Sequence, residues 1–108
     1  MPTRREQIEA MLADEPDDVF LRYALAMEWG KEGDYEKSLA GLDELTRQSP
    51  PHIPAFFMAA QQLAKLTRVG EARTYLRDGI EQARAQGDTH AAGEMSEFLA
   101  SLGSMPDS

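Results

Sequence analysis

The side chains best suited to acid–base catalysis or metal binding are two histidines, His52 and His90, which stand far apart in the sequence. Protein metal sites draw on several closely spaced Cys, His or carboxylate ligands. The chain has no cysteine, and neither histidine has a second ligand at the spacing of a metal motif. On a helix, His90 and Glu94 would form an ordinary i, i+4 surface pair. The sequence therefore predicts no metal site and no cofactor.

Nucleophilic and phosphate-transfer chemistry has no motif in this sequence either. It contains no glycine-rich phosphate loop, no nucleophile elbow and no paired-acid motif. The acidic clusters Asp14-Glu15 and Asp17-Asp18 are explained by helix capping and by the positive end of the helix dipole. We expect a protein without enzyme activity.

Composition and charge indicate one small folded domain. The 108 residues are 42% hydrophobic and carry a net charge of −8, which is too apolar for a disordered chain. An acidic surface repels phosphate backbones, so nucleic acid is not an expected partner, although the charge could serve solubility alone. Apolar stretches such as Ile53 to Ala60 are too short to span a bilayer, and no apolar signal region follows Arg4 and Arg5. We expect a cytoplasmic protein that does not bind membranes.

Apolar residues recur at helical spacing along almost the whole chain, and no stretch alternates like a strand. Thr3-x-x-Glu6 is a capping box at the start of the first helix, and Asp34 can cap the third. Asp17 or Asp18, and Asp88 or Thr89, can cap the second and sixth. About six helices are expected, ending near Asp14, Gly33, Ser49, Leu66, Gly87 and Leu102. Their connections are short, so successive helices should pack antiparallel in an all-α fold.

The sequence matches itself when it is shifted so that Val19 falls on Ile53. Small residues then recur where helices approach closely, and large apolar residues recur where they fill the space between helices. The other pairs at the same shift are Leu25 with Ala59, Ala26 with Ala60, Trp29 with Leu63, Tyr35 with Val69, Ser38 with Ala72, Leu42 with Leu76 and Pro16 with Pro50. Each unit is a helical hairpin that must stack on a neighbour to bury its apolar face.

In these residues the chain resembles the tetratricopeptide repeat family, whose period is ~34 residues, in the form of a small bacterial-type protein with two full repeats. The first repeat reads Leu25-Ala26-x-x-Trp29, Gly33-Asp34-Tyr35, Ser38, Leu42 and Pro50, and the second reads Phe56-x-x-Ala59-Ala60-x-x-Leu63, Ala72 and Leu76. The departures are Arg22 and Arg84, which stand where the family has a large residue and a proline. The resemblance implies a short right-handed superhelix of stacked hairpins. Its parts would be an N-terminal capping helix over 1–16, repeats over 17–50 and 51–88, a C-terminal capping helix over 89–102 and a tail over 103–108.

The resemblance also implies a function. Such proteins bind a peptide or partner protein in the concave groove lined by the first helix of each repeat. The side chains that would face this groove are Phe20, Tyr23, Met27 and Lys31 from the first repeat and Phe57, Gln61, Ala64 and Lys65 from the second. An alternative is that Phe20, Tyr23 and Phe57 pack between helices. The family's carboxylate clamp for chaperone tails needs Lys and Asn where Tyr23 and Met27 stand, so that ligand is not expected.

Self-assembly is the alternative to partner binding. Phe56, Phe57 and Met58 follow one another, so at least one large side chain must point away from the main buried face of its helix. A homodimer would cover such a surface. The sequence therefore predicts a non-catalytic interaction scaffold, with homo-oligomerisation through the same apolar surface as the second hypothesis.

Overall fold

The structure is a computed structural model that describes residues 1–106, and within this range it contains six α-helices and no strand. They are α1 (Arg4–Asp14), α2 (Val19–Lys31), α3 (Tyr35–Arg47), α4 (Ile53–Lys65), α5 (Val69–Ala85) and α6 (Thr89–Leu102). The predicted all-α fold is confirmed. The tail predicted over 103–108 extends beyond the part described, because residues 107 and 108 lie outside it.

The helix starts follow from local side-chain chemistry. The hydroxyl of Thr3 accepts a hydrogen bond from the Glu6 amide at 3.1 Å, and Glu6 accepts one from the Thr3 amide at 2.9 Å, which completes the predicted capping box. Aspartates cap α2, α3 and α6, namely Asp18, Asp34 and Asp88. Beyond α2 and α5, Gly33 and Gly87 have φ angles of +84° and +77°, a conformation that only glycine adopts without strain.

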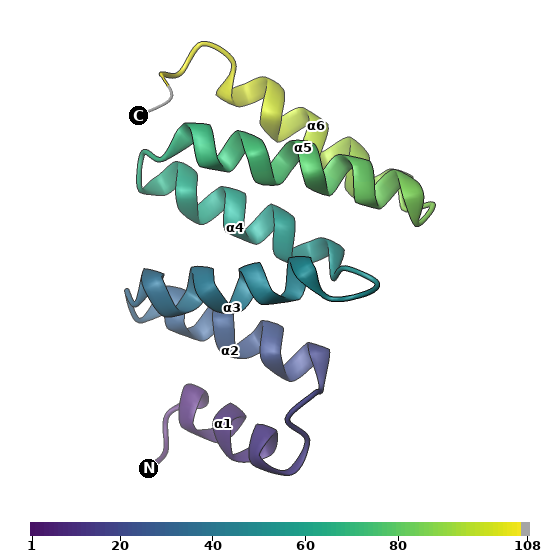
Figure 1. The fold of residues 1–108 in the computed structure, drawn as a ribbon. Coiled ribbons are helices and arrows are strands. Elements are labelled where there is room, and N and C mark those ends of the chain that lie inside the picture. Colours follow the sequence, from purple (N-terminus) through teal and green to yellow (C-terminus); the bar gives the residue numbers. More distant parts are fainter. Residues whose placement is uncertain (107–108) are drawn as a thin grey trace.

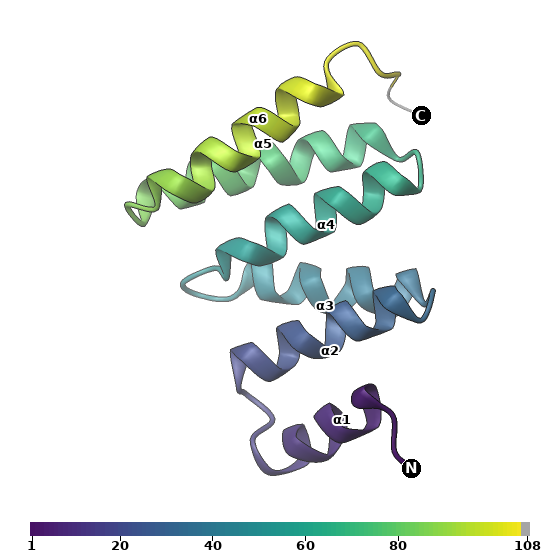
Figure 2. The same ribbon diagram turned by 180° about the vertical axis from the view of Figure 1, so that it is seen from behind.

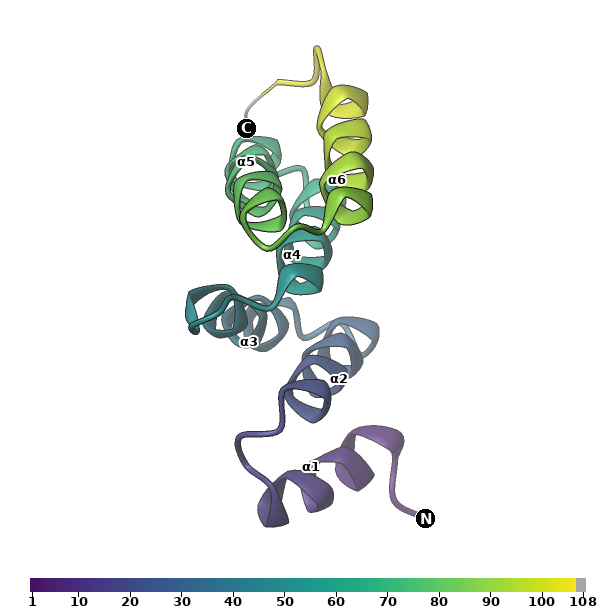
Figure 3. The same ribbon diagram turned by 90° about the vertical axis from the view of Figure 1, so that its right-hand side faces the viewer.

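The helices stack in chain order into an elongated body of 45 × 30 × 18 Å, with α1 at one end of the stack and α6 at the other (Figure 1). The same order is seen from behind in Figure 2. Viewed nearly along the helix axes (Figure 3), α2, α4 and α6 lie on one side and α3 and α5 on the other. Within residues 1–106, no helix combines the length and the apolar character needed to cross a bilayer.

The hydrophobic core is centred on α4, which contributes to two clusters. One cluster joins Phe56 and Leu63 of α4 with α5 and α6, and the other joins Ala55 and Ala59 with α2 and α3. Ala26 and its counterpart in the second repeat, Ala60, are both fully buried. These small residues let neighbouring helices approach closely, as the repeat predicts. Because α4 belongs to both clusters, it joins the two repeats into one core.

A buried polar chain crosses this core. Nε2 of Gln62 on α4 donates to the hydroxyl of Ser38 on α3 at 2.8 Å, and that hydroxyl donates to the carbonyl of Ala26 on α2 at 2.6 Å. Gly30 makes room for it, since a Cβ at this position would lie 2.7 Å from Nε2 of Gln62. These two hydrogen bonds therefore link α2, α3 and α4 inside the core.

The two ends of the stack are attached by different forces. Within α1, Ile8 alone is buried, whereas α6 buries Ala92, Met95 and Leu102. The main polar link of α1 is Arg5, whose Nε lies 3.0 Å from both carboxylate oxygens of Glu32 beyond α2. The N-terminal helix therefore depends on exposed charged contacts much more than the C-terminal helix does.

Candidate partner-binding groove

The side of the molecule formed by α2, α4 and α6 contains an apolar pocket of about 180 Å³. Its walls are Tyr23 from α2, then Ile53, Pro54, Phe57, Met58 and Gln61 from α4, and Asp88, Ala91, Glu94 and Met95 from the start and first half of α6. A cavity of ~150 Å³ is large enough to hold a benzene ring. This pocket therefore has room for about one large apolar side chain.

Two aromatic rings of the pocket are held in place by their own neighbours. Tyr23 meets the ring of His52 edge-on with centroids 5.0 Å apart, and Phe57 lies 5.7 Å from Phe98 of α6. Burial raises the pKa of Tyr23 and lowers that of His52, and it thereby favours the neutral form of both rings. Tyr23 and Phe57 are thus both packed and accessible, and they offer a fixed, uncharged surface.

The α6 wall of the pocket is acidic. Oδ1 of Asp88 caps α6 by accepting the Ala91 amide at 3.0 Å. The carboxylate of Glu94 lies 3.3 Å from Nε2 of His90, and 52% of the Glu94 side chain is exposed. No lysine or arginine occurs anywhere in α6. A ligand in the pocket therefore meets negative charge on this side.

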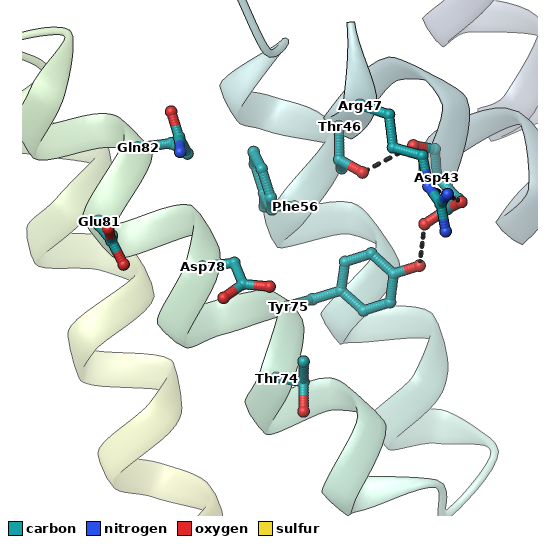
Figure 4. A pocket seen from close by; sticks show the side chains of 9 residues that line it. All are labelled: Asp43, Thr46, Arg47, Phe56, Thr74, Tyr75, Asp78, Glu81 and Gln82. Atoms are coloured by element: carbon teal, nitrogen blue, oxygen red, sulfur yellow. Dashed lines mark hydrogen bonds and ion pairs between the residues drawn. The ribbon is translucent and has the colours of Figure 1, made fainter.

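A larger cleft of about 580 Å³ lies between α3 and α5 on the other side of the molecule, with Phe56 of α4 at its floor (Figure 4). The Tyr75 hydroxyl donates to Oδ1 of Asp43 at 2.6 Å, and Nε of Arg47 lies 2.7 Å from Oδ2 of the same carboxylate. Burial, and then this hydrogen bond, raise the pKa of Tyr75. Asp43 therefore ties α5 to α3 and keeps Tyr75 protonated. Among the residues described, no three His, Cys, Asp or Glu side chains are grouped to hold a metal ion.

The chain is similar to known proteins over most of its length. No protein-family model matches the chain. It is 28% identical over 97 residues to TPR repeat-containing protein PA0015 of Pseudomonas aeruginosa, a match that covers 90% of this chain and 92% of that protein. It also matches the solution structure of protein BPP2914 from Bordetella parapertussis with a TM-score of 0.79 and 25% identity, over 94% of this chain and 89% of that one. The resemblance to the tetratricopeptide repeat family is confirmed.

The groove residues expected from the tetratricopeptide resemblance are only partly brought together. Tyr23, Phe57 and Gln61 line the pocket. Four others lie elsewhere: Phe20 is 80% exposed at the start of α2, Met27 is partly buried, Lys31 pairs with Glu28 at 3.1 Å, and Lys65 is exposed at the end of α4. Ala64 packs against the core cluster of α4, α5 and α6. Whether any of these side chains binds a partner stays a prediction.

The groove residues expected from the sequence include none from α6, although the repeat period also predicts equivalent positions on this helix. The sequence presents the segment 89–102 only as a cap for the last apolar face. A second shift by the same repeat length aligns Ala91 with Tyr23 and Phe57, and it aligns Met95 with Met27 and Gln61. Both new positions line the pocket. By this alignment, α6 lies where the first helix of a third repeat would lie.

Proposed function

We propose that the chain is a non-catalytic scaffold that binds a segment of a partner polypeptide in the groove formed by α2, α4 and α6. The observation that carries this proposal is the pocket to which three successive first helices contribute side chains at equivalent repeat positions. The name of the Pseudomonas aeruginosa relative, a TPR repeat-containing protein, supports it. A cytoplasmic location and a protein or peptide partner belong to the same proposal.

The composition of the pocket suits peptide docking. Aromatic side chains dominate the energetics of many interfaces, and methionine adapts its shape to different apolar partners. Tyr23 and Phe57 are positioned by His52 and Phe98, so little conformational freedom remains for them to lose on binding. Burying one leucine or phenylalanine of a ligand contributes about 1.5–3 kcal/mol. One anchored side chain therefore gives modest affinity, to which contacts along the rest of the groove would add.

The test is selection of random peptides displayed on phage by the immobilised full chain and by two variants. Ala91→Leu fills the pocket from α6, and Ala100→Leu makes the same change at an exposed position of the same helix. We expect the wild type and Ala100→Leu to enrich the same peptides, and Ala91→Leu to lose them while its circular dichroism stays helical. Failure of the wild type to enrich any peptide, or enrichment of the same peptides by Ala91→Leu, would overturn the proposal.

Homo-oligomerisation is the second candidate function, and the exposure of Phe20 favours it. This ring is 80% exposed, and Met11 of the neighbouring α1 is 51% exposed. Burying both between two copies would remove apolar surface from water. Sedimentation velocity over a range of concentrations tests this, with Phe20→Ser expected to shift the protein toward monomer. A wild type that stays monomeric throughout would eliminate self-assembly.

A further inference from the structure

We infer that the groove selects a basic partner segment, in which an apolar side chain fills the pocket and a neighbouring lysine or arginine lies against Asp88 and Glu94. This inference rests on the proposed function, because it specifies the ligand of the same groove. It depends on the charges around the pocket, which the repeat pattern alone does not determine.

The apolar and acidic surfaces belong to one cavity. Asp88 and Glu94 line the same pocket as Tyr23 and Phe57, so adjacent side chains of one ligand can contact both. The carboxylate of Glu94 pairs with His90 in an exposed i, i+4 pair, a kind of pair that is worth little in water. Asp88 uses one carboxylate oxygen, Oδ1, for the helix cap. Both carboxylates are therefore available to a cationic side chain.

The lysines expected to face the groove lie too far along it to neutralise this charge. The helices α2, α4 and α6 alternate with α3 and α5 in an antiparallel stack, so they run in the same direction. Pro54, at the start of α4, lines the pocket beside Asp88, whereas Lys65 is the last residue of that helix. The helix between them spans ~16 Å, about twice the Debye length of ~8 Å at physiological ionic strength.

The arrangement also disfavours the opposite kind of ligand. An acidic segment anchored in the pocket would bring its carboxylates close to Asp88 and Glu94, and like charges at such distances repel. The positions that would grip an acidic chain end in the carboxylate clamp hold Tyr23 and Met27, which carry no positive charge. The groove therefore discriminates by charge as well as by apolar fit.

The test uses three displayed peptide libraries that share a fixed central leucine and differ in its two flanking residues, which are lysine, glutamine or glutamate. Each library is selected on the full chain, on Asp88→Asn/Glu94→Gln and on Asp78→Asn/Glu81→Gln. The first variant keeps the α6 cap, because asparagine caps as well as aspartate does. The second makes the same two changes on exposed residues of α5 that line the cleft on the other side of the molecule.

We expect the wild type to enrich the lysine library over the glutamate library. The ratio should fall by about two- to fivefold for each carboxylate removed in Asp88→Asn/Glu94→Gln and stay near the wild-type value in the α5 variant. Equal enrichment of the three libraries, or an equal fall in both variants, would overturn the charge selection while leaving peptide binding intact. Enrichment of no library by the wild type would instead refute the proposed function, and the inference with it.

Discussion

Gln62 on α4 donates a 2.8 Å hydrogen bond to Ser38 on α3, across the boundary between the two repeats. Both side chains are buried, at 6% and 0% exposure. The Ser38 hydroxyl in turn donates to the backbone carbonyl of Ala26 on α2. The second amide atom of Gln62, Oε1, accepts no hydrogen bond from residues 1–106. A polar contact inside an otherwise apolar core thus links one repeat to the other.

Removing one partner of this hydrogen bond should lower the free energy of unfolding more than removing both partners. Ser38→Ala leaves Nε2 of Gln62 buried without an acceptor, so we expect a loss of about 1–3 kcal/mol in the free energy of unfolding. Ser38→Ala/Gln62→Met should recover part of that loss, because the buried amide is gone. Urea unfolding measures both, with Ser101→Ala at an exposed position of α6 as the control. A double variant less stable than Ser38→Ala would contradict this account.

Gly79 is expected to be intolerant of a side chain. A Cβ there would lie 2.6 Å from Sδ of Met95 and 2.6 Å from Cβ of Phe56, where α5 meets α4 and α6. We expect Gly79→Ala to lower the free energy of unfolding by about 1–3 kcal/mol through overpacking. Gly93→Ala is the matched control, because nothing lies within 4 Å of its added Cβ, and it should instead stabilise α6 by ~0.5–1 kcal/mol. Thermal unfolding that moves both variants in the same direction would show the packing argument to be wrong.

Tyr75 should make the free energy of unfolding fall at alkaline pH. Burial and the hydrogen bond to Asp43 raise its pKa in the folded state, whereas an unfolded tyrosine ionises near pH ~10. The folded state therefore holds this proton more tightly, and the stability it contributes is complete below about pH 10 and is lost as the pH rises further. In urea unfolding at increasing pH, the free energy of unfolding of Tyr75→Phe should fall less steeply than that of the wild type. Tyr35→Phe should show the same fall as the wild type. Equal slopes for wild type and Tyr75→Phe would rule out this origin.

The N-terminal helix should detach before the rest of the stack. Ile8 is its one buried residue, and the contact of Arg5 with Glu32 is an exposed ion pair that salt weakens. We expect the amides of α1 to exchange with solvent faster than those of α4, and faster still in high salt or in Arg5→Gln. Arg77→Gln, on the exposed face of α5, should leave α1 exchange unchanged. Uniform protection along the chain would contradict this prediction.

Most of the fold could be predicted because local signals and the repeat period agree. Asp34, Gly33 and Gly87 mark helix ends by chemistry that does not depend on the rest of the chain. The departure at Arg22 could not be explained in advance. Its guanidinium reaches Glu44 at 3.5 Å and Gln48 at 3.4 Å, so a polar link between α2 and α3 occupies a position where the family has a large residue.

The candidate site was less predictable, since it depends on how far each side chain is covered by other helices. The period predicts Tyr23 and Phe57 on one surface, and both line the pocket. Periodicity cannot say that Phe20, about one turn earlier on α2, would be left 80% exposed. The run of Phe56, Phe57 and Met58 divides between two sides of α4, with Phe56 under the larger cleft and the others in the pocket. The acidic wall of the pocket belongs to α6, which the sequence predicts only as a C-terminal capping helix.

The unequal attachment of the two ends gives the molecule a preferred direction of disassembly. A processive protease that pulls on α1 should meet a helix that separates alone, because Ile8 is the one residue that α1 buries. Pulling on the carboxyl terminus has to break Met95 and Leu102 away from a cluster that also contains Leu76 of α5. A tether that must bear load, or a fusion meant to resist trimming, therefore belongs at the carboxyl end.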